Sequence, residues 1–511
     1  MSEVNKNTIE ESSVALPKMD SDDSVALPTT EQKSVEKTPD GWVCPEFKVS
    51  GAFASNMVLQ REKPIKIWGF STNVGGKVFC EFNSQSASTI IPEDGKWTLT
   101  LMPERYSREG RELVIYHELG HREVFTDVLV GDVYLIGGQS NAEVNLSHCM
   151  SYTPSLEFYE DEKIRLFPQR QGFVYTHQEF CNHPQRDIIN PEWTWMKPTR
   201  EAACAFSAMG FYFARELTRF VDVPIGLVMM AAGGACIREL LPEALAHNEG
   251  YFVGANVKEA GYYNALIHPF IGLSFRAMLF FQGESEGLDR GLAEKYTYEL
   301  ALLVADERRS FGFEFPFYNV QLSSYCKTGS DIFRFNDIIR MKQFDALQVI
   351  PNSSLVVDMD LGSPEDFHDW AHSPRKLELG ERLAKVVLAK EYGIEKESEV
   401  TSPMPVEANY YPAAHKIMIE FKNVSSGLTV LGYTPVDSLD REIEGFSVGD
   451  RDDQIKVRAT VANRSTVLID LPEGVVPDYV NYAYFTLVTI DNANLRGGNN
   501  LPAPAFSIPV K

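Results

Sequence analysis

Ser140 stands in the run Gly137-Gly138-Gln139-Ser140-Asn141, directly after the apolar segment 133–136. Two glycines let the chain turn steeply away from a strand, which would leave the Ser140 hydroxyl exposed at the end of that strand. A serine hydroxyl is a weak nucleophile until a base takes its proton, and that base must be held by a carboxylate or carbonyl. Taken alone, such a run is more often a turn than a nucleophile. Whether Ser140 is a nucleophile therefore depends on the segments that come later in the chain.

Three later apolar segments are also followed by polar groups that could act with Ser140. They are 225–230 followed by Gly233-Gly234, 277–281 followed by Gln282-Gly283-Glu284-Ser285, and a strand near Leu355 followed by the acidic loop 366–372. In an open parallel sheet, ligands bind outside the carboxyl ends of the strands. These groups would supply backbone N–H donors, a side-chain amide and an acid–imidazole pair. Acyl transfer needs this set, and each donor to its oxyanion contributes about 3 kcal/mol.

The elements that must position these groups alternate between strands and helices from residue 129 to 395. Buried parallel strands are expected at 133–136, 225–230, 277–281 and 355–357, and helices at 206–220 and from Ser373-Pro374 onward, with Pro374 in the first helical position. This alternation predicts an α/β fold in which a parallel sheet forms the middle of three layers.

Patterns typical of β structure flank this region on both sides. Short apolar or alternating runs occur at 65–68, 77–79, 97–101, 113–116, 416–419, 466–469 and 483–487. We therefore expect β-sandwich-like domains at 45–128 and 403–511 around a catalytic domain at 129–395. Residues 1–42 are rich in polar residues and proline, which predicts a disordered acidic tail.

Charge and composition argue against several function classes. The net charge of -23 is unfavourable for binding nucleic acid or an anionic membrane. The apolar runs are too short for a transmembrane helix, and the first 40 residues lack the apolar core of a signal peptide. Seven scattered cysteines without a Cys-x-x-Cys pair suit a reducing compartment. We expect a cytoplasmic protein that uses no metal or cofactor and has no nucleic-acid or membrane partner.

The motifs Gly138-Gln139-Ser140-Asn141, Gly233-Gly234, Gln282-Gly283-Glu284-Ser285 and a terminal Asp/His block resemble, in this order, the sialate O-acetylesterase family of SGNH/GDSL hydrolases. The stretches 54–61, 263–269 and 494–506 are also similar to that family, so the resemblance covers nearly everything from 48 to 508. It implies an SGNH-hydrolase (flavodoxin-like) fold and a Ser-His-Asp esterase that removes acetyl groups from a small O-acetylated sugar.

The resemblance also implies roles for individual residues. Ser140 would be the nucleophile and would give its own N–H to the oxyanion hole. Gly234 would supply a second N–H, and Gln282 would supply a side-chain donor. The residues that would support these groups or contact substrate are Gly233, Asn141 and Glu284. A carboxylate at the start of a helix is an equally good interpretation of Glu284.

Two acid–imidazole pairs compete for the role of the base. In the family, the catalytic histidine precedes a Gly-Glu-Arg-Leu sequence by eight residues, and counting back from Gly380 gives His372. We therefore predict that His372 is the base and that Asp369 holds it. Asp366 and His368 form the alternative pair.

Departures from the family pattern leave the substrate and even the activity open. Ala142 and Ala235 stand where the family usually has Met and Thr, and both positions would shape the pocket. A deacetylase for xylan or other hemicellulose oligosaccharides is one alternative. A carbohydrate-binding protein on a catalytically retired scaffold is another. The sequence does not determine the oligomeric state.

Overall fold

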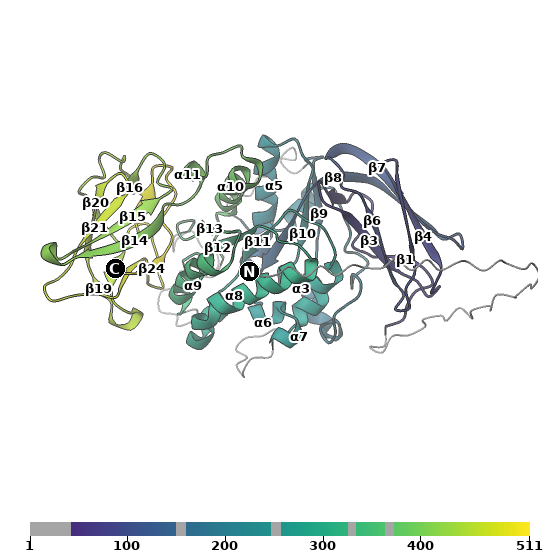
Figure 1. Ribbon diagram of the computed structural model, residues 1–511, viewed down its shortest axis with the longest axis horizontal. Helices are drawn as coiled ribbons and strands as arrows, with labels where there is room; N and C mark the ends of the chain where they lie inside the picture. Colours follow the sequence, from purple (N-terminus) through teal and green to yellow (C-terminus); the bar gives the residue numbers. More distant parts are fainter. Residues whose placement is uncertain (1–41, 150–159, 247–256, 325–333, 363–371) are drawn as a thin grey trace, which may run out of the picture.

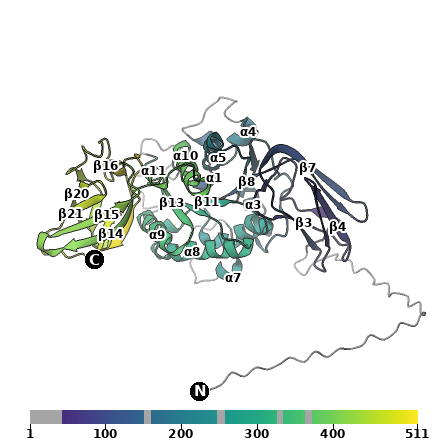
Figure 2. The same cartoon turned by 45° about the horizontal axis from the view of Figure 1, so that its top comes forward.

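The computed structural model describes residues 42–149, 160–246, 257–324, 334–362 and 372–511 (Figure 1). The predicted tail 1–42 lies outside the described residues except for Trp42. A central region of strands and helices lies between two β regions, which occupy opposite ends of the long axis (Figure 2).

Six parallel strands form the central sheet in the spatial order β9, β10, β8, β11, β12 and β13. They are β8 (Arg122–Gly138), β9 (Ile164–Phe167), β10 (Ile225–Met229), β11 (Ala277–Phe281), β12 (Phe317–Gln321) and β13 (Ser353–Val357). Every residue of β10 and β11 is buried, which explains why these strands are continuous apolar runs in the sequence.

Helices cover both faces of this sheet. Two pairs, α5 (Ala208–Phe220) with α10 (Lys376–Val387) and α8 (Arg290–Phe311) with α9 (Asn336–Val349), lie on opposite sides of it in Figure 1. α5 and α10 approach closely because residue 380 is a glycine: an added Cβ there would lie 2.6 Å from Tyr212 Cβ. The predicted α/β fold is confirmed. Within the described residues, no helix is both long and apolar enough to cross a membrane.

The cap of α5 also supports the segment that carries Ser140. The Ser207 hydroxyl accepts a hydrogen bond from Gly210 N–H at 3.0 Å and donates to the Ala142 carbonyl at 2.6 Å. The expected helix at 206–220 therefore begins after an N-cap serine, as is common.

The prediction for the start of α10 is wrong by two residues, since the helix begins at Lys376 and not at Pro374. The Ser373 hydroxyl lies 3.3 Å from the Leu361 carbonyl and 3.4 Å from Asp358 Oδ1. These contacts hold the segment before α10 against the end of β13, so the helix starts only beyond it.

The N-terminal β region is continuous with the central sheet through β8. The first half of β8 pairs antiparallel with β7 (Ser107–His117), which continues to β4 (Lys77–Phe82) and β5 (Gln85–Ile90). A separate sheet contains β1 (Lys48–Val49), β3 (Ile65–Phe70) and β6 (Lys96–Leu101). The predicted boundary at 128/129 falls inside the 17-residue strand β8. The division into domains stays a prediction.

The C-terminal region contains two larger sheets and a strand pair. One sheet has the order β14 (Met404–Tyr411), β15 (Lys416–Lys422), β21 (Thr466–Asp470), β20 (Arg458–Asn463) and β17 (Glu442–Ile443). The other has β19 (Ile455–Lys456), β18 (Phe446–Val448), β22 (Tyr479–Tyr482) and β24 (Phe506–Pro509), and the pair is β16 (Leu428–Val430) with β23 (Leu495–Gly497). Side chains from all of these sheets share one hydrophobic core.

The strand expected at 483–487 is not formed. Ala483 has φ 53°, which ends the extended conformation of β22. The carbonyl oxygens of Phe485 and Thr486 instead accept hydrogen bonds from Arg340 Nη2 of α9. This part of the prediction is wrong because a buried arginine takes the backbone groups that a strand would need.

A buried carboxylate in α8 makes stability depend on pH. Burial raises the pKa of Glu307 to about 8 from an ordinary 4.5. The native state then holds a proton that the unfolded chain releases, so the free energy of unfolding falls as pH rises from 4.5 to about 8. Glu307→Gln should change stability little at pH 5 and raise it at pH 9 by on the order of a few kcal/mol in urea unfolding.

The exposed Glu93 provides the control for this comparison. Glu93→Gln should alter the free energy of unfolding by less than about 0.5 kcal/mol at either pH. The same pH dependence in wild type and Glu307→Gln would contradict the assignment.

Candidate active site

Ser140 is the first residue of the short helix α1 (Ser140–Glu143), immediately after β8. It is partly exposed, whereas Gln139 and Asn141 on either side are buried. The turn is held by two backbone hydrogen bonds, from Gln139 N–H to Phe281 O at 2.9 Å and from Ala232 N–H to Gly138 O at 3.0 Å. The sheet therefore positions the serine at the carboxyl end of β8, between β10 and β11.

Gly138 is required for this turn. Its φ is 117°, and an added Cβ would lie 2.0 Å from the Phe281 carbonyl oxygen. Gly138→Ala should lower the free energy of unfolding by more than about 2 kcal/mol, because backbone strain and a clash with β11 act together. Thermal or urea unfolding measures the change.

Gly312→Ala is the matched control for Gly138→Ala. Gly312 also has a positive φ, 83°, but an added Cβ would meet no atom within 4 Å among the described residues. Its destabilisation should be smaller, about 1 kcal/mol, since only the backbone conformation is penalised. Equal losses in the two variants would show that the close approach to β11 is unimportant.

The Gly233-Gly234 loop follows β10 and is bonded to several elements. Gly233 N–H donates to Glu143 Oε2 at 2.8 Å, and Gly233 O accepts from Gln171 Nε2 at 2.8 Å. Gly234 O accepts from the Ser285 hydroxyl at 3.0 Å. Within the described part of the chain, the N–H groups of Ser140 and Gly234 donate to no protein acceptor. Two backbone donors beside the serine are thus available to a ligand.

Gln282 is fully buried, and its side-chain amide nitrogen is hydrogen-bonded within the protein. Its Nε2 lies 3.2 Å from Gln139 Oε1 and 3.0 Å from Ala235 O, and it also contacts the Glu286 carboxylate. An amide nitrogen has only two hydrogens, so these acceptors use its capacity. The role of Gln282 as an oxyanion donor stays a prediction. Its amide joins the end of β11 to the loops after β8 and β10.

The Glu286 carboxylate also binds the segment that follows the Gly233-Gly234 loop. Its Oε1 accepts a hydrogen bond from Ile237 N–H at 2.7 Å. Burial raises the pKa of Glu286 to about 8, against the opposing effect of that hydrogen bond.

Asn141 and Glu284 form a buried network with Lys376, the first residue of α10. Asn141 Nδ2 donates to Glu284 Oε1, and Lys376 Nζ donates to Asn141 Oδ1 at 2.6 Å. Burial raises the pKa of Glu284, while the Asn141 hydrogen bond and the charges of His372 and Lys376 act in the opposite direction. No local sequence pattern indicates Lys376 as part of the site, since a lysine is rarely fully buried.

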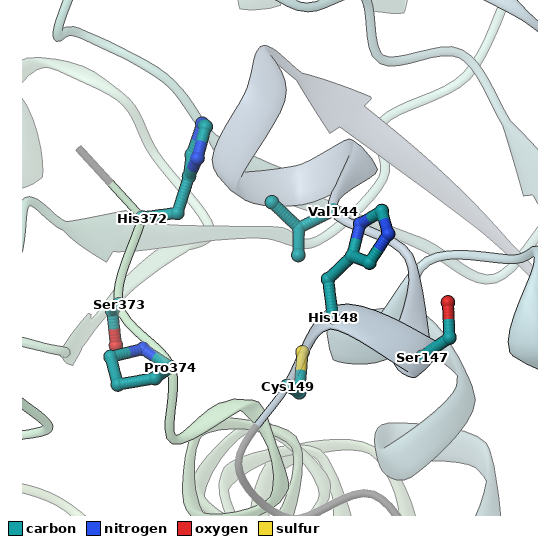
Figure 3. A pocket seen from close by; sticks show the side chains of 7 residues that line it. All are labelled: Val144, Ser147, His148, Cys149, His372, Ser373 and Pro374. Carbon is teal, nitrogen blue, oxygen red and sulfur yellow. The ribbon is translucent and has the colours of Figure 1, made fainter. Parts of the chain in front are cut away.

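His372 lines a cavity of about 570 Å³ (Figure 3). The other lining residues among those that the structure describes are Val144, Ser147, His148, Cys149, Ser373 and Pro374. The cavity thus lies between the segment that follows α1 and the segment that precedes α10. The predicted residues Asp366, His368 and Asp369 lie outside the described residues, so the choice between the two acid–imidazole pairs stays a prediction.

Glu143 is a further residue of the site, and no motif in the sequence marks it. Burial raises the pKa of its carboxyl, and hydrogen bonds from the N–H groups of Gly233 and Gln171 act against that effect, as do the charges of Arg170 and His372. The carboxylate connects the helix of Ser140 with the Gly233-Gly234 loop.

No group of three or more potential metal ligands occurs among the residues that the structure describes. His117 and His121 have a spacing of four residues, but they lie at the turn between β7 and β8 with ring centroids 6.1 Å apart. His117 Nε2 contacts Asn73, and His121 Nε2 contacts Glu46.

Comparisons with known proteins agree with the fold. A family model described as "Carbohydrate esterase, sialic acid-specific acetylesterase" matches residues 130–389. Curated sialate O-acetylesterases of Mus musculus and Homo sapiens are each 26% identical to this chain; they cover 70% of it, and the matches span 76% and 73% of those proteins. The solved structure of a carbohydrate acetylesterase from Xanthomonas citri matches with a TM-score of 0.76 and 26% identity, over 90% of this chain and 99% of that chain.

The sheet, its covering helices and these matches define an α/β esterase fold. The chain belongs to the sialic acid-specific acetylesterase family of carbohydrate esterases, whose model matches half of it. Membership in this family indicates an ester hydrolase and disfavours the alternative of a retired binding protein.

Proposed function

We propose that this chain is a carbohydrate O-acetylesterase that works through a Ser-His-Asp triad and a covalent acetyl-enzyme. The observation that carries the proposal is the environment of Ser140: a partly exposed serine at the end of β8, close to the N–H groups of Ser140 and Gly234, which donate to no acceptor among the described residues. The loop of Gly234 is bonded on both sides of the serine, at Gly138 and at Glu143, which keeps these donors near the hydroxyl.

In the first half of the reaction, the Ser140 oxygen forms a bond to the acetyl carbonyl carbon while His372 takes the hydroxyl proton. The carbonyl electron pair moves to oxygen, and the two N–H groups stabilise the resulting oxyanion. When the intermediate collapses, the bond to the sugar oxygen breaks and His372 returns its proton to that oxygen. Asp369 would hold the imidazole ring in the required orientation, with Asp366 and His368 as the alternative pair.

In the second half, water replaces the sugar. His372 takes a proton from water as the water oxygen attacks the acetyl group, and the return of the proton to Ser140 releases acetate. No metal or redox cofactor enters either half of this scheme.

We assign the acetylated sugar to the cavity that His372 lines. A volume of about 570 Å³ lies within the ~300–1,000 Å³ typical of small-molecule sites. The relatives named sialate O-acetylesterase favour O-acetylated sialic acid, and acetylated xylan or other hemicellulose oligosaccharides are the second candidate.

Acetate release distinguishes the two substrates. We expect a higher kcat/KM on O-acetylated sialic acid than on acetylated xylo-oligosaccharides. The reverse order would overturn the sialic acid assignment, and no acetate release from any acetyl ester would overturn the proposed function itself.

A further inference from the structure

The peptide group that joins Gly233 to Gly234 carries both the Gly233 carbonyl and the Gly234 N–H. In a planar trans peptide these two groups point in opposite directions. Whatever holds the Gly233 carbonyl therefore also determines where the Gly234 N–H points. Gly234 has φ 72°, a conformation that glycine adopts without strain.

Gln171, the first residue of α3 (Gln171–Thr176), holds this carbonyl. Its Nε2 donates to Gly233 O at 2.8 Å and to the hydroxyl of Tyr262 at 3.1 Å. Tyr262 is fully buried, which fixes the second bond in place. A carbonyl oxygen only accepts hydrogen bonds, so the nitrogen of the Gln171 amide must face it, and both amide hydrogens are used.

Glu143 holds the other side of the same glycine. Its Oε2 accepts from Gly233 N–H at 2.8 Å. The space around Gly233 is filled by these two side chains: an added Cβ would lie 3.0 Å from Gln171 Oε1 and 3.2 Å from Glu143 Oε2. Gly233 cannot rotate without breaking one of these bonds.

We propose that Gln171 is a positioning residue of the oxyanion hole: by binding the Gly233 carbonyl, it aims the Gly234 N–H at the carbonyl oxygen of the ester. Gln171 acts through Gly233 and touches neither Ser140 nor the acetyl group in this scheme. The inference rests on the proposed function, because it gives the Gly234 N–H a task only if Ser140 carries out acyl transfer. Preorganised donors act chiefly in the transition state, so removing Gln171 should affect kcat more than KM.

The test uses Gln171→Met, which fills a similar volume without a donor. With p-nitrophenyl acetate, kcat should fall between about 10- and 100-fold while KM changes less than about twofold, since the donor is misaligned and not deleted. The inhibition constant of methylboronic acid, which forms a tetrahedral adduct with an active-site serine, should rise by the same factor as kcat falls. Gln171→Asn, which keeps an amide but withdraws it from Gly233, should show the same pattern if Gln171→Met folds poorly.

Gln454→Met is the matched control. Gln454 Nε2 also donates to two carbonyl oxygens, those of Arg451 and Tyr484, but it lies in the C-terminal β region. Its kcat and inhibition constant should stay within about twofold of wild type. Wild-type kcat in the Gln171 variants, a loss confined to KM, or an unchanged inhibition constant would overturn the role of Gln171. Inactivity of the wild type on every acetyl ester would instead overturn the proposed function, and this inference with it.

Discussion

Ser140→Ala is expected to lower kcat for p-nitrophenyl acetate by about 10⁴-fold or more, with little change in stability. The acetyl-enzyme cannot form without the hydroxyl, and the two backbone donors alone retain only a small part of the catalysis. The side chain is partly exposed at the end of β8, so its loss leaves no cavity in the core. Initial rates and a thermal unfolding curve measure the two effects separately.

Ser88→Ala serves as the control, because Ser88 is an exposed serine of β5 in the N-terminal β region. It should match wild type in rate within about twofold. Full activity in Ser140→Ala would show that Ser140 is not the nucleophile, whatever the other variants show.

His372→Ala should cause a loss of kcat similar to that of Ser140→Ala, about 10⁴-fold, because the serine then has no base. The double variant Ser140→Ala/His372→Ala should be no slower than the slower single variant, since residues that act as one unit are not additive. Steady-state rates of the three variants test this directly.

His368→Ala decides between the two acid–imidazole pairs. We expect it to retain activity within about threefold of wild type. Near-complete loss in His368→Ala, with His372→Ala still active, would assign the base to His368 and its carboxylate partner to Asp366. Losses that multiply in the Ser140/His372 double variant would show that His372 does not act on the serine.

The sequence predicted the fold best where burial made a strand uniformly apolar. All residues of β11 are apolar, and the strand was predicted with the correct ends. β12 was missed because Asn319 and Gln321 interrupt its apolar pattern. The structure buries Gln321 by giving its Nε2 two acceptors, the carbonyl oxygens of Arg340 and Ala505, each at 2.9 Å. Such contacts between distant segments are not visible in a local pattern.

Separation along the chain also determined which parts of the site could be predicted. Ser140 and Gly234 stand in short motifs next to strands, so their positions follow from local sequence. Three residues that hold them were missed: Gln171, Glu143 and Lys376. Their hydrogen bonds join residues 62, 90 and 235 positions apart, to Gly233, Gly233 and Asn141 respectively. Gln282 also stands in a short motif after a strand, and its role as an oxyanion donor stays a prediction; its amide nitrogen contacts Gln139, Ala235 and Glu286.

Covalent labelling can show whether Ser140 is the nucleophile. The wild-type chain would be treated with diethyl p-nitrophenyl phosphate, which phosphorylates an activated serine, and its peptides would be mapped by mass spectrometry as the activity is lost. We expect one phosphoryl group per chain, on Ser140, appearing in proportion to the loss of activity. Inactivation with the label on another residue, or full activity with Ser140 labelled, would contradict this assignment.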